Sequence, residues 1–287
     1  MKILLTGSTG FLGQLLIPYL LEQYNPSQIK LLGRNEGKMY QIIEKYNDKR
    51  LKPELGDVND LLKMTSIVKD VDLVIHAAAL KRVDLCNLCP QEAVKTNIIG
   101  TFNLLHACIN WSKIKKLVYI STDKSLHPTN LYGKTKSVAE SMLLERQKQG
   151  LPFQVTSVRW GNCISSTGAF FPKAIEAIKK GEDIYLTSRE MTRFLMTKRM
   201  ILEVIRNAIY VGANEIVIPK ELLAINIGRG LEIIKDYFQS KSKVKISSIV
   251  SGEKLAEELA YGVFSDEKKY QVTREKFLEL LKEEGLI

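Results

Sequence analysis

Short apolar runs alternate with longer amphipathic segments along the first 160 residues of the chain. The runs KILL, IKLL, VDLVI, KKLVYI and FQVTSV, near residues 2, 30, 71, 115 and 153, predict buried strands. The segments FLGQLLIPYLLEQY, EAVKTNIIGTFNLLHACI and YGKTKSVAESMLLERQ carry apolar residues three and four positions apart and predict helices. Strand and helix repeated in this way predict an α/β fold, a Rossmann-type doubly wound parallel sheet with helices on both faces.

The repeat ends near Asn162, where the chain becomes richer in loops and its helices become shorter. A last helix is expected from about Val272. We therefore assign residues 1–160 to a dinucleotide-binding Rossmann domain, and most of residues 161–287 to a smaller C-terminal substrate-binding lobe. Because no repeat or low-complexity linker separates the two parts, the lobe is expected to lean on the sheet.

Composition places the chain among ordinary globular proteins. Of its 287 residues, 45% are hydrophobic and 26% are charged. No apolar run approaches the roughly 20 residues that a membrane-spanning helix requires. The opening residues MKILLTG predict a first strand rather than a signal peptide. We therefore expect a cytoplasmic protein without a membrane partner.

The net charge of +10 favours anionic partners, although the basic residues are scattered along the chain. A phosphorylated small molecule satisfies this charge as well as nucleic acid does. The main expectation is therefore a nucleotide-linked ligand and no nucleic acid. The alternative from another class is a nucleotide-sensing or nucleic-acid-binding protein on the same fold.

The four cysteines are too few and too irregularly spaced for a disulfide framework. Cys86 and Cys89 form a C-x-x-C pair, but a zinc site needs a second ligand pair at a matching spacing, and none is near. We therefore expect reduced thiols and no metal, with a metal or redox role for this pair as the alternative.

A glycine-rich turn, TGSTGFLG, directly follows the first predicted strand and opens a helix. Glycines in such a turn let the backbone approach a pyrophosphate, whose charge the helix N-terminus stabilises. The spacing is G-x-x-G-x-x-G, and its place at the first strand–helix junction favours dinucleotide binding over a simple tight turn. The assigned residues are Gly7, Ser8, Thr9, Gly10, Phe11, Leu12 and Gly13.

The end of the second strand bears on which dinucleotide binds. NAD enzymes usually place a carboxylate there, whereas NADP enzymes place an arginine. Here Gly33 is followed by Arg34, and no carboxylate occurs before Glu36. We therefore expect NADP, with NAD possible. The alternative is that Arg34 is a solvated surface residue.

Two later strand ends also suit a cofactor. Asp57 and Val58 follow the third strand and suit an adenine contact, although Asp57 serves equally well as a helix N-cap. Small side chains end the fourth strand, where a cofactor can lie close to the backbone. These are Ala77, Ala78 and Ala79.

The motifs TGSTGFLG, HAAALKRVDLC, STDK, YGKTK, RWGN, MTRF and SGEK occur in this order. Together they resemble the extended short-chain dehydrogenase/reductase superfamily, and within it the polysaccharide-biosynthesis branch of inverting UDP-N-acetylglucosamine 4,6-dehydratases. The likeness covers nearly the whole chain, and HAAALK with STDK and NLYGKTK is far more specific than the glycine turn. It implies a UDP-sugar substrate, a nicotinamide cofactor and a homo-oligomer. It also assigns Lys81 and Asn97 to the cofactor.

The resemblance gives roles to Thr122, Tyr132 and Lys136, which match the superfamily's Ser/Thr, Tyr and Lys. A free phenol has a pKa near 10, so a cationic Lys136 one helical turn away is expected to lower the pKa of Tyr132. Tyr132 then accepts a hydroxyl proton. Without Thr122, a Tyr-x-x-x-Lys pair also fits an ordinary surface pair on a helix.

Asp123 and Lys124 suit the elimination step of a 4,6-dehydration. Once a sugar is oxidised at C4, a base must remove the C5 hydrogen while an acid protonates the leaving C6 hydroxyl. Lys124 is the expected base, provided that it is partly neutral, and Asp123 the expected acid, provided that it is protonated. Retaining relatives carry Asp-Glu here, so Lys124 resembles the inverting enzymes. The alternative is a loop salt bridge.

Substrate contacts are implied for Lys81, Asn162, Arg193 and Glu253. Arg193 suits a diphosphate because its guanidinium is a planar fork of donors, although a structural ion pair is the alternative. The chain also departs from the family. It has Val250-Ser251 where the family usually has Arg-Pro, which removes one cationic phosphate contact, and Arg82 where the family usually has His. The resulting alternative is a reductase and 5-epimerase that acts on a 4-keto-5,6-ene UDP-sugar delivered by a partner dehydratase.

Overall fold

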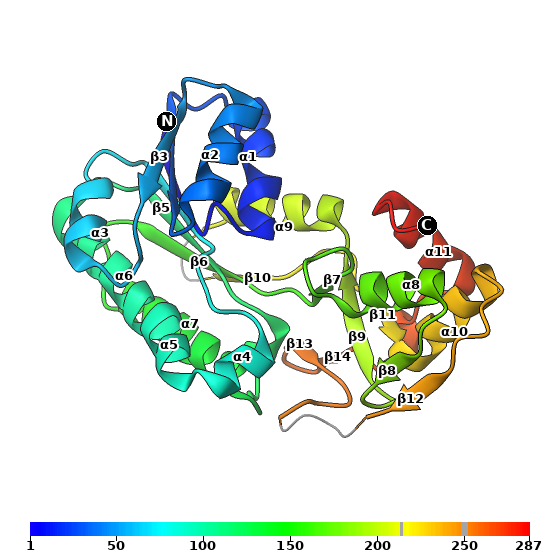
Figure 1. Cartoon of the computed structure of the whole chain (residues 1–287). Helices are drawn as coiled ribbons and strands as arrows, with labels where there is room; N and C mark the ends of the chain where they lie inside the picture. The colour runs from blue at the N-terminus through cyan, green and yellow to red at the C-terminus, as the bar shows by residue number, and fades with distance from the viewer. Residues whose placement is uncertain (213–214, 248–251) are drawn as a thin grey trace.

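The computed structural model of the protein describes residues 1–212, 215–247 and 252–287. Figure 1 shows a large sheet covered by helices on both faces, with a smaller lobe beside it. The sheet has seven strands in the order β10-β6-β5-β4-β1-β2-β3, and all neighbours are parallel. The strands are β1 (Lys2–Thr6), β2 (Gln28–Gly33), β3 (Leu51–Leu55), β4 (Leu73–His76), β5 (Lys116–Ile120), β6 (Gln154–Val158) and β10 (Glu215–Val217). The predicted Rossmann-type fold is confirmed.

Helices form two layers, one on each face of the sheet (Figure 1). One layer packs with the sheet in a core that contains Ile3, Leu5 and Ile75. It consists of α1 (Phe11–Tyr24), α2 (Glu36–Tyr46) and α9 (Lys198–Tyr210). The other layer packs in a core that contains Leu4 and Val74. It includes α3 (Leu61–Ile67), α6 (Gly100–Trp111) and α7 (Leu131–Lys148). Among the helices of the described ranges, none is long and apolar enough to cross a lipid bilayer.

The segment predicted as one helix over residues 92–109 is divided into three parts. Helix α5 (Pro90–Val94) leads into a π-helical turn (Lys95–Ile99), which leads into α6. In this turn the Asn97 amide donates hydrogen bonds to Leu80 O at 3.0 Å and to Thr135 Oγ1 at 2.9 Å. This π-helical turn has five residues and is too short to be distinguished from an α-helix by the spacing of apolar residues, so the helical period did not reveal it. The turn ties the loop after β4 to helix α7.

Part of the C-terminal third returns to the sheet. Helix α9 supplies buried side chains to the first core, and β10 pairs with β6 along Glu215–Val217. Buried Lys116 of β5 donates to the carbonyl oxygens of Val211 and Gly212, at 2.6 and 3.1 Å. The sheet domain therefore contains α9 and β10 in addition to residues 1–160. Strand β10 is too short to stand out in the sequence.

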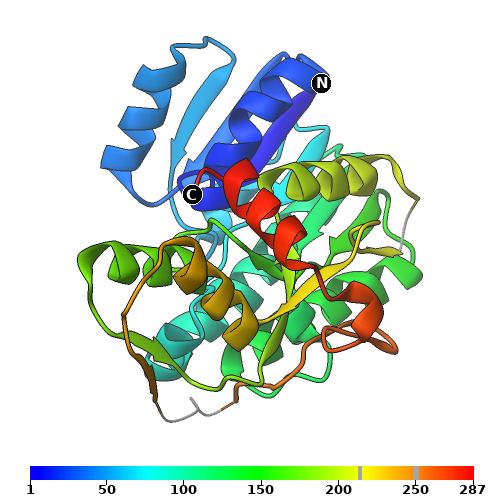
Figure 2. The ribbon, with the colours of Figure 1, turned by 90° about the vertical axis from the view of Figure 1, so that its right-hand side faces the viewer.

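Helix α4 (Val83–Leu88) lies beside α5 in the larger part of the molecule. The other elements form the smaller lobe, which Figure 2 shows from the front. They are β7 (Asn162–Cys163), α8 (Phe170–Lys180), β8 (Ile184–Leu186), β9 (Thr192–Met196), β11 (Leu223–Asn226), α10 (Ile227–Tyr237), β12 (Val244–Ile246), β13 (Glu258–Ala260), β14 (Val263–Phe264), a 3₁₀ turn (Lys268–Tyr270) and α11 (Arg274–Glu283). Its core contains Phe171 and Phe277, whose ring centroids lie 5.0 Å apart. The last helix begins two residues after the predicted start, where the Thr273 hydroxyl caps it by accepting from Lys276 N.

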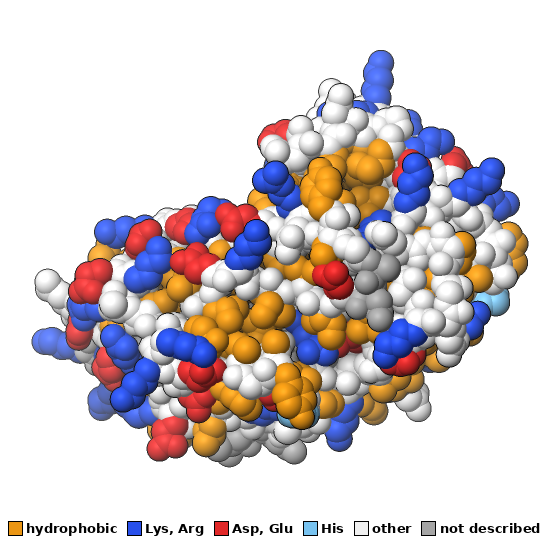
Figure 3. Space-filling view, turned by 180° about the vertical axis from the view of Figure 1, so that it is seen from behind, with side chains coloured by type: hydrophobic (Ala, Val, Ile, Leu, Met, Phe, Trp, Pro, Cys, Tyr) orange, Lys and Arg blue, Asp and Glu red, His pale blue; other side chains and the backbone are white. Residues whose placement is uncertain are grey.

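Charged side chains of both signs lie side by side on the face seen in Figure 3. Exposed ion pairs of the protein include Arg189 with Glu232 at 2.9 Å and Lys276 with Glu279 at 3.1 Å. On this face, the net positive charge is therefore not gathered into one basic patch.

Candidate active site

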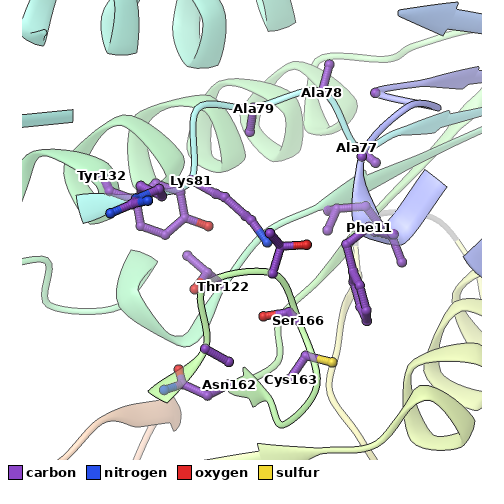
Figure 4. A pocket seen from close by; sticks show the side chains of 18 of the residues that line it. Phe11, Ala77, Ala78, Ala79, Lys81, Thr122, Tyr132, Asn162, Cys163 and Ser166 are labelled. Atoms are coloured by element: carbon purple, nitrogen blue, oxygen red, sulfur yellow. The ribbon is translucent and has the colours of Figure 1, made fainter. Parts of the chain in front are cut away.

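A cavity of about 840 Å³ lies where the carboxyl ends of the parallel strands meet the smaller lobe. This edge of an open α/β sheet is the usual place for a ligand. The cavity brings together most of the residues singled out in the sequence. They are Gly7, Thr9, Gly10, Phe11, Leu12, Arg34, Asp57, Val58, Ala77, Ala78, Ala79, Lys81, Thr122, Lys124, Tyr132, Lys136, Asn162, Arg193 and Glu253. In Figure 4 the Lys81 side chain extends between Tyr132 and Phe11 into the cavity.

Four of the singled-out residues do not line this cavity, namely Ser8, Gly13, Asn97 and Asp123. Ser8 is buried and its hydroxyl donates to Leu32 O at 3.0 Å, while Gly13 packs against the backbone of Ser8. Ser8, Gly13 and Asn97 therefore support the residues that line the cavity without lining it themselves. Asp123 is fully buried.

The glycine turn fits the pyrophosphate of a dinucleotide. Gly7 has a φ of 70°, and a Cβ on it would lie 2.8 Å from the backbone of Ala77 and Ala78, so only glycine fits there. Gly10 begins helix α1 without a side-chain cap, which leaves the first N–H groups of the helix available to an anion. The turn therefore has the features that the sequence predicted for phosphate binding.

The end of the cavity next to Arg34 and Asp57 contains a cation held by a carboxylate. Arg34 Nη1 lies 3.2 Å from Asp57 Oδ2, and Asp57 Oδ1 accepts from Asn59 N at 3.0 Å. Helix α3 is capped instead by Asp60, so the N-cap alternative for Asp57 is wrong. Lys38 also lines this end of the cavity, which places two cations near it.

The catalytic loop joins β5 to α7. It contains Thr122 and a 3₁₀ turn (Asp123–Ser125), and the Asn130 side chain caps the following helix by accepting from Gly133 N at 2.9 Å. A Cβ on Gly133 would lie 2.2 Å from the carbonyl oxygen of Lys124, so this glycine allows the helix to pack directly on the turn. The close contact brings Tyr132 and Lys124 to the same wall of the cavity.

Asp123 and Lys124 form the centre of a buried polar network. Lys124 Nζ lies 3.1 Å from Asp123 Oδ1 and 3.2 Å from Asn162 Oδ1. The Thr122 hydroxyl donates to Asp123 Oδ1 at 3.0 Å. Asp123 Oδ2 is buried without a hydrogen-bond partner among the described residues.

Glu257 joins this network and was not singled out in the sequence. Its Oε1 lies 3.2 Å from Lys124 Nζ, and the residue is 2% exposed. Burial alone would lower the pKa of Lys124, but the carboxylates of Asp123 and Glu257 raise it above its ordinary value. A base role for Lys124 needs a lowered pKa, so the direction of this shift is opposite to the expected one. The sequence offered no signal, because EKLAEEL is typical of a solvated helix face.

The carboxyl of Asp123 behaves as the acid role requires. Burial raises its pKa, although Lys124 acts in the opposite direction. Glu257, which also faces Arg193 and Lys254, has a lowered pKa because these three cations outweigh its burial. In the resting site, the proton is therefore favoured on Asp123 rather than on Glu257.

Tyr132 and Lys136 titrate differently from the expectation. Burial raises the pKa of Tyr132 to about 12, against the opposing effects of Lys124 and Thr122. Burial also lowers the pKa of Lys136 to about 7, although Glu140 acts to raise it. The groups that act to lower the pKa of the phenol are therefore Lys124 and Thr122, and burial outweighs them. Lys136 packs instead over the ring of Tyr119 at 4.0 Å.

The residues assigned to the substrate come from both lobes. Arg193 is 6% exposed and donates to Thr192 O at 2.8 Å and Leu255 O at 3.3 Å. These backbone contacts hold its guanidinium at the cavity wall, and no ion pair of Arg193 occurs among the described residues. Glu253 Oε2 is buried and has no hydrogen-bond partner within residues 1–212, 215–247 and 252–287. Val250 and Ser251 lie outside the described residues.

The cysteines and Arg82, which were noted in the sequence, lie outside the polar network around Lys124. All four cysteines are free thiols, as predicted, and burial raises the pKa of Cys86 to about 11, which makes it a poor nucleophile. No group of three potential metal ligands occurs within residues 1–212, 215–247 and 252–287. Arg82 pairs with exposed Asp84 at 2.5 Å, at the edge of the cavity.

Sequence comparison shows the family. A model described as "Polysaccharide biosynthesis protein" matches residues 3–280. An uncharacterized membrane protein of Methanocaldococcus jannaschii is 35% identical over 268 residues, which is 90% of this chain and 79% of the relative. A UDP-N-acetylglucosamine 4,6-dehydratase (inverting) of Campylobacter jejuni is 35% identical over 225 residues, 76% of this chain and 66% of the relative. A UDP-glucose 4-epimerase of Rickettsia massiliae is 30% identical over 262 residues, 90% and 76%.

Comparison with solved structures supports the same fold. Pen from Bacillus thuringiensis matches 100% of this chain and 98% of its own, with a TM-score of 0.90 and 27% identity. DesIV, a dTDP-glucose 4,6-dehydratase from Streptomyces venezuelae, matches 99% and 96% with a TM-score of 0.83, and its 19% identity shows the fold alone. The chain therefore belongs to the polysaccharide biosynthesis protein family within the extended short-chain dehydrogenase/reductases, and it is an enzyme of the nucleotide-sugar dehydratase and epimerase type.

Proposed function

We propose that the protein is a nucleotide-sugar 4,6-dehydratase that inverts C5 of UDP-N-acetylglucosamine or a close UDP-hexosamine, for the synthesis of surface glycans or glycoprotein sugars. The observation that carries this proposal is the Asp123–Lys124 pair: Lys124 lines the same cavity wall as Tyr132, and buried Asp123 contacts its amine from behind that wall. A 4-epimerase only removes and returns hydrogen at C4, so it has no use for a second acid and base. The C. jejuni relative, named as a dehydratase, supports the same reading.

A nicotinamide dinucleotide, when bound, supplies the acceptor and donor of hydride. The turn from Gly7 to Leu12 would hold its pyrophosphate, and Arg34 with Lys38 would face the phosphate of an NADP ribose. Both cations line the cavity, and the Asp57 carboxylate beside Arg34 already holds its guanidinium in place. We therefore propose NADP as the cofactor, with NAD as the alternative.

The side chains of the chain then take three roles. Tyr132 accepts the proton of the sugar 4-hydroxyl, while Lys124 removes the proton from C5. Asp123 supplies the proton for the leaving C6 hydroxyl. Since Asp123 lies behind the wall, this proton passes through Thr122 or Lys124, which both contact its carboxyl and line the cavity.

Arg34→Ala is expected to weaken the binding of NADP while leaving that of NAD unchanged, because only NADP carries the phosphate that the guanidinium would contact. One exposed charge-assisted contact suggests a loss of roughly tenfold. Titration calorimetry of the apoprotein with each dinucleotide measures the change. An equal loss for NAD and NADP, or recovery of NAD alone from the purified protein, would contradict the assignment.

The proposed reaction is tested by incubation with UDP-N-acetylglucosamine, followed by mass spectrometry and NMR. A dehydratase yields a 6-deoxy-4-keto sugar that has lost one water. A product of unchanged mass with C4 inverted would instead identify a 4-epimerase. Light scattering checks the expected homo-oligomer, and fractionation of the cells checks the expected cytoplasmic location.

One observation favours a second candidate, a reductase and 5-epimerase that acts on a 4-keto-5,6-ene UDP-sugar. The raised pKa of Lys124 keeps its amine protonated, and a protonated amine suits the delivery of a proton to C5. In that case intact UDP-N-acetylglucosamine stays unchanged, while the 4-keto-5,6-ene substrate is consumed.

A further inference from the structure

A segment of the smaller lobe, residues 252–258, lies across the catalytic loop. The Thr129 hydroxyl and the Asn130 amide both donate to Gly252 O, at 2.6 and 3.1 Å. The Lys254 amine donates to Leu126 O at 2.8 Å. Figure 1 shows the hairpin of β13 and β14, which continues this segment, between the two lobes. The catalytic loop is therefore held from the second lobe as well as from the sheet.

Glu257 is the residue of this segment that contacts a proposed catalytic group. Its Oε1 lies 3.2 Å from Lys124 Nζ. Its backbone N–H donates to the Ser265 hydroxyl at 2.9 Å, and Ser265 Oγ lies 2.8 Å from Thr192 Oγ1 in strand β9. The backbone of Glu257 is therefore held by a buried network that starts next to Arg193 and does not involve the catalytic loop.

Charged groups from three elements face this carboxylate. Lys124 and Asp123 come from the catalytic loop, Arg193 from β9 and Lys254 from the segment itself, with Lys254 Nζ 3.7 Å from Glu257 Oε2. Among the charged groups of the described residues, Lys124 is the one whose amine lies within 3.5 Å of Oε1, at 3.2 Å. Its amine thus lies between two buried carboxylates, one from each lobe.

We propose that Glu257 is a positioning residue for the Lys124 amine, which it holds at the cavity wall and in the protonated form from the second lobe. This inference rests on the proposed function, in which Lys124 exchanges a proton with C5. A flexible lysine side chain reaches many positions, and contacts with two carboxylates, one from each lobe, restrict where its amine lies. The second lobe, which also carries Arg193 and Glu253, therefore sets the state of the proton-transfer group as well as the shape of the substrate site.

The charge has a predictable sign. A carboxylate within about 4–6 Å stabilises the ammonium, so its removal lowers the pKa of Lys124 by about one unit or more. In Glu257→Gln, the ammonium is therefore lost at a lower pH than in the wild type. If neutral Lys124 is the base, the rising limb of the kcat/KM profile moves to lower pH in the same variant.

The experiment compares Glu257→Gln with Glu258→Gln. Glu258 is the matched control, because it is 4% exposed and adjacent in the chain but contacts His127 Nδ1 at 2.9 Å rather than Lys124. The side-chain nitrogen signal of Lys124, assigned with Lys124→Arg in ¹⁵N-lysine-labelled protein, is titrated by NMR. We expect it to titrate at lower pH in Glu257→Gln and to remain as in the wild type in Glu258→Gln.

An unchanged Lys124 titration in Glu257→Gln, or an equal shift in both variants, would overturn the proposal. Glu257→Asp keeps the charge but shortens the side chain by one methylene, so its shift should be smaller. If Glu257→Gln does not fold, the comparison of Glu257→Asp with Glu258→Asp carries the test. The NMR measurement needs no turnover: a shifted titration in a protein that dehydrates no UDP-sugar supports the role of Glu257 and rejects the proposed reaction.

Discussion

Tyr132→Phe is expected to slow the oxidation of the sugar at C4 by about 10²–10⁴-fold, the usual contribution of one general base. The variant removes only the phenolic oxygen that accepts the 4-hydroxyl proton. The ring still fills the wall beside Lys81, so dinucleotide binding should remain as in the wild type. Single-turnover absorbance of the reduced nicotinamide, with UDP-N-acetylglucosamine as substrate, measures the effect.

Tyr119→Phe is the matched control for this variant. Tyr119 is another buried tyrosine, and its ring lies under the same lysine, Lys136. Its hydroxyl has no hydrogen-bond partner among the described residues, and the residue does not line the cavity. We expect near wild-type rates, because only an uninvolved hydroxyl is lost. Wild-type turnover by Tyr132→Phe would remove Tyr132 from the mechanism.

Most elements of the fold could be predicted from local patterns in the sequence. The helix predicted from FLGQLLIPYLLEQY coincides with α1 (Phe11–Tyr24), because a glycine turn starts it and Asn25 ends it in the left-handed conformation. Strand β10 was missed, since three residues give no measurable alternation and its place in the sheet depends on pairing with β6. The π turn was missed because five residues are too few to distinguish a π turn from an α-helix by the spacing of apolar residues.

The candidate site was predictable where motifs are local, and was not where it depends on distant packing. Thr122, Lys124 and Tyr132 belong to one loop and one helix start, so their sequence order already places them together. The side chain of Glu257 contacts that of Lys124 although the two residues are more than 100 positions apart in the chain. No periodicity in the sequence indicates such a contact. The protonation states depend on the same packing: burial lowers the pKa of Lys124, but the carboxylates of Asp123 and Glu257 raise it above its ordinary value, opposite to the direction that a base role needs.

Asp123→Asn combined with Lys124→Ala is expected to stop elimination while substrate still binds. Neither side chain is assigned to the nucleotide, and the loss of both an acid and a base should lower turnover by at least about 10²–10⁴-fold. Changing both residues avoids leaving a single buried charge of the pair, and Glu257 keeps Lys254 nearby at 3.7 Å. Thermal unfolding checks that the variant folds. Lys134→Ala, an exposed lysine of the same segment, is the control and should behave as the wild type.

Isotopes assign the effect of this pair to one step. In heavy water, the wild type should yield a 6-deoxy-4-keto sugar with deuterium at C5, while the hydrogen that began at C4 appears at C6. The double variant should form no such product, because no group remains to remove the C5 proton or to protonate the leaving hydroxyl. Oxidation at C4 should still be detectable, since Tyr132 and Lys136 are unchanged. Turnover of intact substrate by the double variant would reduce Asp123 and Lys124 to a buried loop salt bridge, with Lys124 Nζ simply neutralised at 3.1 Å.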